Sequence, residues 1–399
     1  MSGVTLHIYQ HEIKDIISMW NLQLKSIQGL LPKDYTENDI VGLLKLFYPH
    51  EWYSVEIKYW YYTKKDKHIK RHYGKARYNM KPPEKLLYSS RKYRELLSID
   101  CRNKYAANYS EKKTNELKEK LWDKRKAKIE QINQKIEIAK SKTQQVTPLF
   151  IHQLTGLYER KNTSQKDKMY IIAELQKYYS FDIIQFFFKL NDTELNKQLR
   201  WIAFYHLQSF NYQPRARRQK YMQVHTKNKK RKAYLKNVYP NETYTIPKTP
   251  MELEYRIENA KEQKVKVFDY FISHSYIDSN SVQKLISYEN NIGKNIFCDW
   301  ICDSDYLKRN LLCDATLNVL EKRLEQSKCL LFVDSNNSRN SVWCKYELNY
   351  FRELGKLMYY ITIEDIENGR FEIMPFLDEW YLDSAYKDLA LLEGAKAIP

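Results

Sequence analysis

Residues 341–354 read Ser-Val-Trp-Cys-Lys-Tyr-Glu-Leu-Asn-Tyr-Phe-Arg-Glu-Leu, a pattern that predicts one amphipathic helix. Its first residue is a common helix N-cap, and Gly355 follows as a typical helix end. Trp343 and Glu347 are four residues apart, so they lie one turn above each other. A carboxylate beside an indole at the edge of a core suits a cationic, flat-faced substrate. Taken alone, the pair is more typical of an exposed helical Glu beside a half-buried Trp.

Outward from this helix, the sequence between 265 and 363 alternates between apolar strands and amphipathic helices. The predicted strands are 265–272, 295–299, 329–333 and 358–363, and the predicted helices between them include 281–288 and 316–326. This alternation predicts an α/β fold with an open parallel sheet covered by helices on both faces. Ligands bind beyond the carboxyl ends of the strands in such sheets.

Polar residues occupy those strand ends, which makes them candidate ligand contacts. They are Ser273 and His274 after the first strand, Asp299 after the second, and Ser335 after the third. Ordinary loop polarity would give the same pattern, so their position alone is only suggestive.

Four motifs in this region resemble the bacterial type of TIR (Toll/interleukin-1 receptor) domain. They are Phe-Asp-Tyr-Phe-Ile-Ser-His-Ser at 268–275, Phe-Cys-Asp-Trp at 297–300, Ser-Lys-Cys-Leu-Leu-Phe-Val-Asp-Ser-Asn-Asn-Ser at 327–338 and Ser-Val-Trp-Cys-Lys-Tyr-Glu-Leu at 341–348. Their order and spacing also match, over roughly residues 264–382. The resemblance implies a flavodoxin-like fold.

Many bacterial and plant TIR domains cleave NAD+ at its nicotinamide–ribose bond, and the resemblance assigns roles to individual residues here. Glu347, in its Trp and Cys setting, matches the catalytic carboxylate. Ser273 and His274 match the loop after the first strand. Asp299 matches the acidic residue that ends the second strand, and Trp343 is expected to line the substrate face.

The implied chemistry is reasonable for a single carboxylate. Nicotinamide is a good leaving group because its ring nitrogen is cationic while bonded and the ring departs neutral. The ribose develops oxocarbenium charge, as in glycoside hydrolysis. One carboxylate can stabilise that charge while it holds the ribose hydroxyls. We therefore expect no metal ion and no cofactor, with NAD+ as the substrate.

Composition and cysteine usage indicate a soluble intracellular protein. The 399 residues are 43% hydrophobic and 29% charged. The sequence has no apolar run of membrane-spanning length and does not begin with a signal-peptide pattern. The six cysteines form no CxxC pair, which fits a reducing cytoplasm and gives no zinc signature. We expect a cytoplasmic protein whose cysteines are mostly small core residues.

The net charge of +18 is unevenly distributed, which indicates units with different partners. Residues 1–260 hold 50 Lys and Arg against 27 Asp and Glu, whereas residues 261–399 hold 17 against 22. We interpret 1–250 as a basic, mainly helical region that senses or binds a partner, with a possible internal boundary near 110–147. Residues 251–263 are interpreted as a linker helix and 264–399 as the TIR domain.

Local patterns give a coarse picture of the basic region. Alternating apolar residues predict a possible β-hairpin over 58–78, although strand and helix are hard to separate there. Residues 110–145 have the composition of a long exposed helix or a helical hairpin. Residues 147–212 predict three amphipathic helices, the last one capped at 191–193. A capping-box spacing at 249–252, with Pro in second place, predicts the start of another helix.

Residues 195–241 contain no acidic side chain, which makes this segment a candidate contact for nucleic acid or a nucleoprotein. Basic residues with interleaved tyrosines suit phosphate binding and base stacking. The candidates are Arg215, Arg217, Arg218, Lys229, Lys230 and Arg231. A solvated basic surface explains the same composition.

Three functions follow from these observations. The first is an antiphage (abortive-infection) effector that cleaves NAD+ when its basic region brings TIR domains together by self-association. The second is a non-catalytic TIR scaffold. The third is a TIR enzyme that makes a cyclic ADP-ribose-type signal. Replacement of Glu347 separates the second from the others, and product analysis separates the first from the third.

Overall fold

The computed structural model describes residues 4–217, 222–307 and 313–377. Among these residues no helix has both the length and the apolar character needed to cross a membrane. The chain forms two compact units that exchange short segments. The first comprises 1–137, 191–193 and 203–223, and the second comprises 138–190, 194–202 and 224–399.

The first unit is helical. Its elements are α1 (Val4–Ile27), η1 (Gln28–Leu30), α2 (Glu37–Phe47), α3 (Pro49–Tyr73), α4 (Pro83–Leu87), α5 (Arg91–Leu97), α6 (Ile99–Ala107) and most of α7 (Glu111–Ser141). Trp20, Leu24 and Phe47 are fully buried in its core. The long exposed helix predicted at 110–145 is confirmed by α7, because all of its residues keep solvent exposure.

The possible β-hairpin at 58–78 is wrong, because most of these residues belong to α3. That helix starts with Pro49 and ends at Gly74, whose φ of 81° suits a glycine. The buried carboxylate of Asp66 then accepts backbone N–H groups of Arg77, Tyr78 and Asn79 at 2.7–3.0 Å. These bonds fold the segment after α3 back onto the helix, so it does not pair as a strand.

The second unit begins with helices that precede the sheet. They are α8 (Phe150–Glu159), α9 (Gln165–Leu175), α10 (Phe181–Thr193), α11 (Lys197–Ser209), α12 (Lys229–Asn237), η3 (Tyr239–Asn241), α13 (Pro250–Asn259) and α14 (Lys261–Lys264). The ends of α10 and α11 belong to the first unit. The predicted start at Pro250 is confirmed, with Thr249 accepting the Glu252 N–H.

The predicted cap at 191–193 is wrong, and 147–212 holds four helices instead of three. Residues 191–193 form the last turn of α10. The cap of α11 is Asn196, whose side-chain oxygen accepts the Leu199 N–H at 3.1 Å. Asp192 is instead engaged by the side chains of Tyr61 and Arg217. Its carboxylate therefore serves packing within the first unit.

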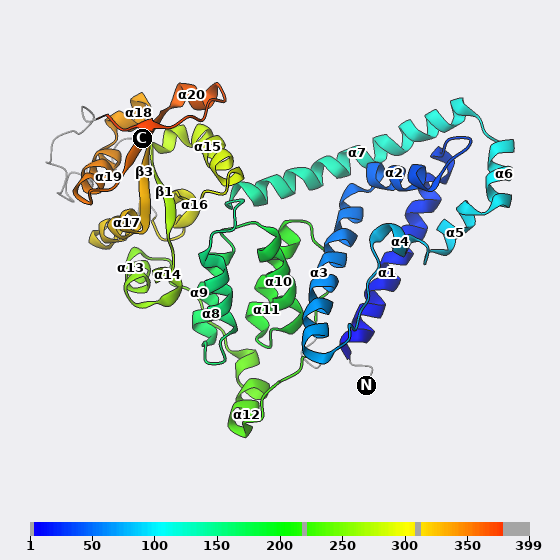
Figure 1. The fold of residues 1–399 in the computed structure, drawn as a ribbon, viewed down its shortest axis with the longest axis horizontal. Helices are drawn as coiled ribbons and strands as arrows, with labels where there is room; N and C mark the ends of the chain where they lie inside the picture. The colour runs from blue at the N-terminus through cyan, green and yellow to red at the C-terminus, as the bar shows by residue number, and fades with distance from the viewer. Residues whose placement is uncertain (1–3, 218–221, 308–312, 378–399) are drawn as a thin grey trace. The chain divides into compact units, whose positions relative to one another are not determined.

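The sheet confirms the predicted α/β fold (Figure 1). The remaining elements are β1 (Phe268–Ser273), η4 (Tyr276–Asp278), α15 (Ser279–Asn291), β2 (Ile296–Phe297), α16 (Asp299–Cys302), α17 (Asp314–Gln326), β3 (Ser327–Asp334), α18 (Asn336–Asn340), α19 (Val342–Glu353), β4 (Met358–Thr362), α20 (Ile363–Glu367) and β5 (Met374–Pro375). The strand order is β2-β1-β3-β4-β5. β1 to β4 are parallel, and β5 is antiparallel to β4.

Two apolar clusters cover the two faces of this sheet. One joins Phe271 and Phe332 to α17 and α19, and the other joins Ile272 and Val333 to α15 and α20. Alternate residues of each strand point to opposite faces, so neighbouring residues enter different clusters. The parallel strands β1, β2 and β3 end at the same edge of the sheet, at Ser273, Phe297 and Asp334. Candidate ligand residues follow these ends.

Candidate functional site

Helix α19 positions Glu347 against the end of β1. The Ser341 hydroxyl accepts the Cys344 N–H, which confirms the predicted cap, and Gly355 follows with a φ of 63°. Cys344, Leu348 and Phe351 are buried in the sheet cluster that includes β1 residues. That apolar stripe fixes the rotation of the helix and directs Glu347 toward Ser273.

Glu347 and Ser273 each place a polar atom out of contact with solvent and near the other. Oε2 of Glu347 and Oγ of Ser273 are both out of contact with solvent, and neither makes a hydrogen bond within the described residues. Burial raises the pKa of Glu347 well above its ordinary value, while the nearby Ser273 hydroxyl lowers it and the negative charge of Asp299 raises it further. A carboxyl oxygen that is kept from solvent without a good hydrogen bond is costly, which is typical of a functional position.

His274 is held in one orientation beside this pair. The Trp300 indole N–H donates to Nε2 of His274 at 2.9 Å, and Nδ1 of His274 lies 3.2 Å from the Ile272 carbonyl. Nε2 accepts the indole hydrogen bond, and Nδ1 faces the Ile272 carbonyl, so both contacts fix the orientation of the ring. Trp300 was not among the predicted site residues. Its signal in the sequence was only its position after Asp299.

One cluster among the described residues has the composition of a metal site. His274, Cys298 and Asp299 offer ligand atoms within 4.8 Å of one another. Both ring nitrogens of His274 already have partners. Burial, with the charge of Asp299, raises the pKa of the Cys298 thiol well above its ordinary value. A protonated thiol and an engaged imidazole are poor metal ligands.

The structure brings some of the predicted residues together and separates others. Ser273, His274, Asp299 and Glu347 gather at the ends of β1 and β2. Ser335 caps α18 and donates to Asp278 at 2.5 Å, so its hydroxyl already has a local role. Trp343 is half-buried against the apolar cluster beneath α19. A contact of Ser335 or Trp343 with substrate stays a prediction.

The basic candidates divide according to their partners. Arg217 is buried and bonds to Asp192 and Glu12, and Arg215 forms an ion pair with Asp15. The segment 195–241 contains no acidic residue, but acidic residues from other segments therefore lie next to its arginines. Arg218 lies outside the described residues. Lys229 and Lys230 are exposed on α12, whereas Arg231 contacts the Lys161 carbonyl.

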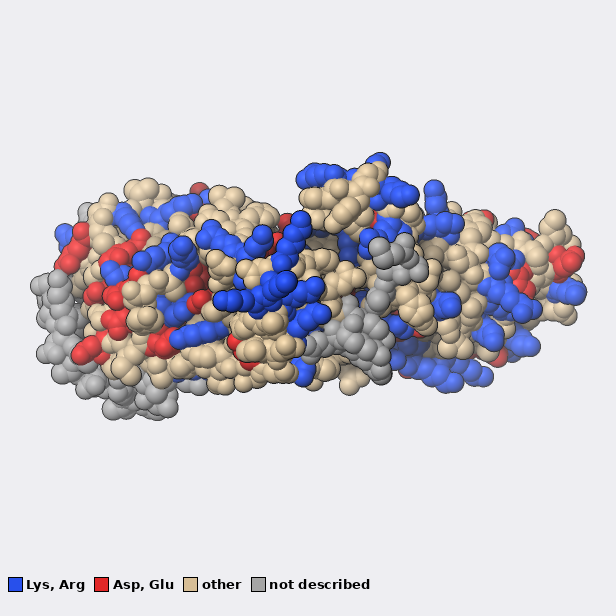
Figure 2. Space-filling model, turned by 90° about the horizontal axis from the view of Figure 1, so that it is seen from below, with Lys and Arg blue, Asp and Glu red and all other residues tan. Residues whose placement is uncertain are grey.

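Basic side chains outnumber acidic ones on the face shown in Figure 2, and the acidic ones are most frequent at the left of the view. This surface agrees with the net charge of +18. It does not distinguish a nucleic-acid contact from a solvated basic surface, so the nucleic-acid hypothesis stays a prediction.

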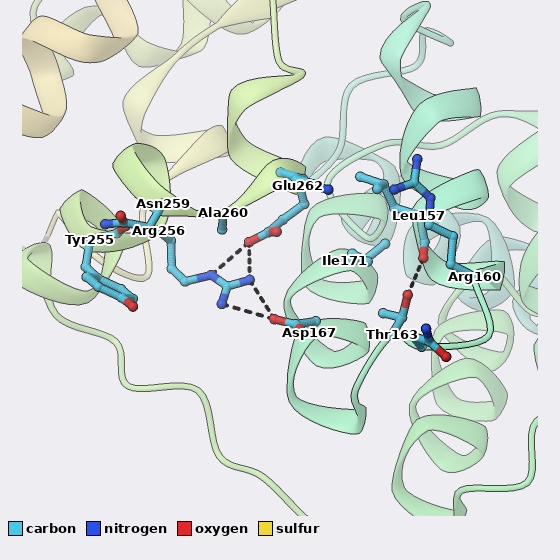
Figure 3. A pocket seen from close by; sticks show the side chains of 12 residues that line it. Leu157, Arg160, Thr163, Asp167, Ile171, Tyr255, Arg256, Asn259, Ala260 and Glu262 are labelled. Carbon is cyan, nitrogen blue, oxygen red and sulfur yellow. Dashed lines mark hydrogen bonds and ion pairs between the residues drawn. The ribbon is translucent and has the colours of Figure 1, made fainter. Parts of the chain in front are cut away.

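A cavity lies away from Glu347, between α8–α9 and α13–α14 (Figure 3). Its volume is about 360 Å³. Arg256 forms part of its lining, but its guanidinium is shared between Glu262 at 2.5 Å and Asp167 at 3.3 Å, and stacks over Tyr170. Because these carboxylates already neutralise Arg256, the cavity resembles a packing junction more than an anion site.

The strand order, the helices on both faces and a carboxylate helix against β1 define the protein as a TIR-domain protein. Residues 271–368 match the family model described as the TIR-like domain of the Thoeris protein ThsB. The chain is 36% identical over 376 residues to a Cytobacillus dafuensis protein named putative cyclic ADP-D-ribose synthase TIR2, covering 94% of this chain and 96% of that protein. It belongs to the family of this protein, helical region included.

A second relative matches a shorter part of the chain. It is a Bacillus cereus protein named probable 3′ cyclic ADP-D-ribose synthase ThsB′, 36% identical over 88 residues, which are 22% of this chain and 45% of that protein. No solved structure gives a significant match. The predicted resemblance to a TIR domain is confirmed.

Proposed function

We propose that this protein cleaves the nicotinamide–ribose bond of NAD+, with Glu347 as the catalytic carboxylate. The main support is the pair of solvent-excluded polar atoms, Glu347 Oε2 and Ser273 Oγ, which lie near each other at the carboxyl edge of the sheet without a hydrogen bond of normal geometry. Ribose hydroxyls of a bound nucleotide would satisfy both. The positive nicotinamide ring would also favour the ionised carboxylate, offsetting the burial that raises its pKa.

We infer that the cleaved nucleotide is closed into a ring. The bond from C1′ to the nicotinamide nitrogen breaks, and nicotinamide leaves with the bonding electrons as a neutral molecule. A nucleophile within the same ADP-ribose then bonds to C1′ and loses a proton if it is a hydroxyl. The names of both relatives, cyclic ADP-D-ribose synthases, support cyclisation over simple hydrolysis. In hydrolysis water would take the same place and ADP-ribose would form.

We further propose a role in antiphage defence in which self-association of TIR domains switches the enzyme on. The match to a Thoeris protein model supports this role. A permanently active enzyme would deplete the NAD+ of its own cell. The dilute protein is therefore expected to turn over NAD+ slowly, and concentrated protein faster per molecule.

The decisive experiment measures nicotinamide release and separates the nucleotide products for wild type, Glu347→Gln and Glu353→Gln. Glu353 is exposed at the end of the same helix and is the matched control. We expect Glu347→Gln to lose about a thousandfold or more of the wild-type rate, because it loses electrostatic stabilisation of the oxocarbenium charge. Glu353→Gln should keep the wild-type rate.

The products separate the remaining candidates. A cyclic nucleotide as main product supports the synthase, and ADP-ribose supports plain hydrolysis. Release that is equal in wild type and Glu347→Gln would refute the catalytic role of Glu347. Concentrated wild-type protein with no turnover in the presence of nucleic acid would favour the non-catalytic scaffold.

A further inference from the structure

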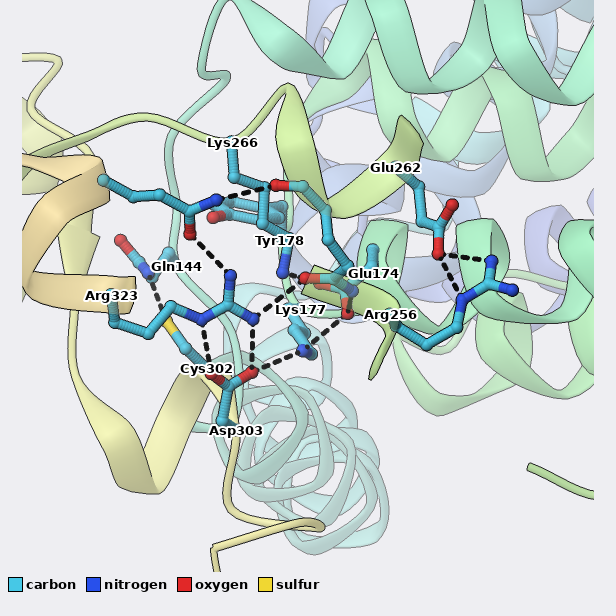
Figure 4. A network of polar contacts seen from close by, with 12 residues as sticks. Gln144, Glu174, Lys177, Tyr178, Arg256, Glu262, Lys266, Cys302, Asp303 and Arg323 are labelled. Atoms are coloured by element: carbon cyan, nitrogen blue, oxygen red, sulfur yellow. Dashed lines mark hydrogen bonds and ion pairs between the residues drawn. The ribbon is translucent and has the colours of Figure 1, made fainter. Parts of the chain in front are cut away.

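Five ionisable side chains form a buried network within the second unit (Figure 4). Asp303, at the end of α16, bonds to Arg323 of α17 at 2.8 Å and to Lys177 at 3.3 Å. Lys177, just after α9, also bonds to Glu174 at 3.0 Å, and Lys266 contacts Glu174. The network joins the helices that precede the sheet to the loop after β2.

The same helical segment also attaches to the edge of the sheet. Gln144 is fully buried, and its carboxamide donates to the Ile296 carbonyl and accepts the Ile296 N–H at 2.9 Å. The Gln144 side chain thus replaces a neighbouring strand along β2. Its backbone bonds in turn to Lys177 and Tyr179, with N–H···O distances of 2.9 and 2.8 Å. Gln144 and Lys177 therefore belong to one hydrogen-bonded local structure.

Asp303 connects this structure to the candidate site. Its backbone N–H donates to the Asp299 carbonyl at 2.9 Å and closes α16. Asp299 and Trp300 form the first turn of that four-residue helix. Trp300 orients His274, and the charge of Asp299 acts on Glu347. A shift of Asp303 would therefore displace Asp299 and Trp300, the two residues around His274.

We propose that Lys177 is a positioning residue, which holds Asp303 so that Asp299 and Trp300 keep their places around His274, the residue next to Ser273. The proposal rests on the function proposed above. Lys177 lies outside the matched TIR segment 271–368. The catalytic unit would then include part of the helical region, and a displacement of α9 would reach the site through Lys177.

The charge balance of the network makes Lys177 a suitable position for a test. Lys177, Lys266 and Arg323 are three cations, against the two anions Glu174 and Asp303. Lys177→Met leaves two cations and two anions, with Arg323 still on Asp303 and Lys266 still on Glu174. The variant loses the link to α9 without leaving a buried carboxylate unpaired, so the fold should persist.

The experiment compares full-length wild type, Lys177→Met, Lys177→Arg and Lys168→Met. Lys168 lies on α9, has a side-chain exposure of 15% against 16% for Lys177, and bonds to Glu194 instead. Steady-state NAD+ turnover gives kcat and KM, and amide hydrogen exchange follows peptides covering 299–307. We expect Lys177→Met to lower kcat by about tenfold to a hundredfold and to speed exchange at 299–307 by about tenfold.

Lys177→Arg should restore most of kcat because it keeps a cation near Asp303. Lys168→Met should keep the wild-type kcat and the wild-type exchange at 299–307, while it lowers overall stability by removing the cation from Glu194. Faster exchange at 299–307 with unchanged turnover would overturn the positioning role. Exchange that rises equally across the whole second unit would also overturn it, because that result indicates general destabilisation. If wild type itself shows no Glu347-dependent turnover, the proposed function fails. Exchange at 299–307 that is the same in wild type and Lys177→Met would then refute the link from Lys177 to Asp303 independently of turnover.

Discussion

Glu347 is the residue whose environment departs most clearly from that of an ordinary surface carboxylate. Burial raises its pKa in the folded protein well above the unfolded value of about 4.3. The folded state therefore binds this proton more tightly than the unfolded chain does. The stabilisation is complete below the unfolded pKa and is lost as the pH rises through the folded pKa.

Glu347→Gln should consequently be more thermally stable than wild type, by a margin that grows with pH. A neutral amide has no proton to lose, so it avoids the cost of a buried charge at higher pH. Thermal unfolding at several values between about pH 4.5 and 8.5 measures this margin. The exposed Glu353→Gln variant should show no such trend. A margin that stays constant with pH would contradict a raised pKa at Glu347.

At the scale of elements, the sequence predicted the features that depend only on residues close together in the chain. The helix containing Glu347, its Ser341 cap and its end at Gly355 were predictable, because caps and periodicity act within a few residues. The clustering of Ser273, Asp299 and Glu347 followed from the strand-end rule and the resemblance. The alternation that predicted a hairpin over 58–78 was misleading, because the buried side chains of α3, such as Trp52, Val55 and Tyr62, are three and seven residues apart and follow the helical repeat.

Contacts between distant segments gave no signal in the sequence. Gln144 and Ile296 are separated by 152 residues, and Lys177 and Asp303 by 126. A polar residue in a loop-like stretch has no local pattern that indicates a buried partner. For the same reason the acid-free segment 195–241 suggested free arginines, although Arg217 is paired with Asp192 and Glu12.

Gln144→Ala tests whether the β2 edge depends on this one side chain. The substitution leaves the buried N–H and C=O of Ile296 without their partner, which should lower the free energy of unfolding by about 1–3 kcal/mol. Denaturant unfolding of the full-length protein measures the loss. Gln145→Ala is the matched control, since the Gln145 side chain is exposed and only its backbone N–H bonds to Asn290. If Gln144→Ala and Gln145→Ala have the same free energy of unfolding, the edge of β2 does not depend on the Gln144 side chain.

At the scale of the whole molecule, the question is whether the segment 264–399 folds by itself. Within the second unit, several of its buried groups take partners from earlier residues. Phe268 packs against Phe150 with ring centroids 6.4 Å apart, and Asn295 accepts a hydrogen bond from Tyr178 at 3.2 Å. With Gln144 and Lys177 these contacts make the helical segment part of the same core.

A fragment of residues 264–399 should therefore be unstable, whereas a fragment of 138–399 should fold. The shorter fragment loses three buried polar partners, Gln144, Lys177 and Tyr178, and the packing of the Phe150 ring. At about 1–3 kcal/mol for each unsatisfied polar group, the loss approaches the whole stability of a typical domain, about 5–15 kcal/mol. Circular dichroism during heating, with size-exclusion chromatography, distinguishes a cooperative monomer from an aggregating chain. If the two fragments unfold cooperatively at the same temperature, the TIR domain is autonomous, and the helical segment then contributes nothing to the stability of the sheet.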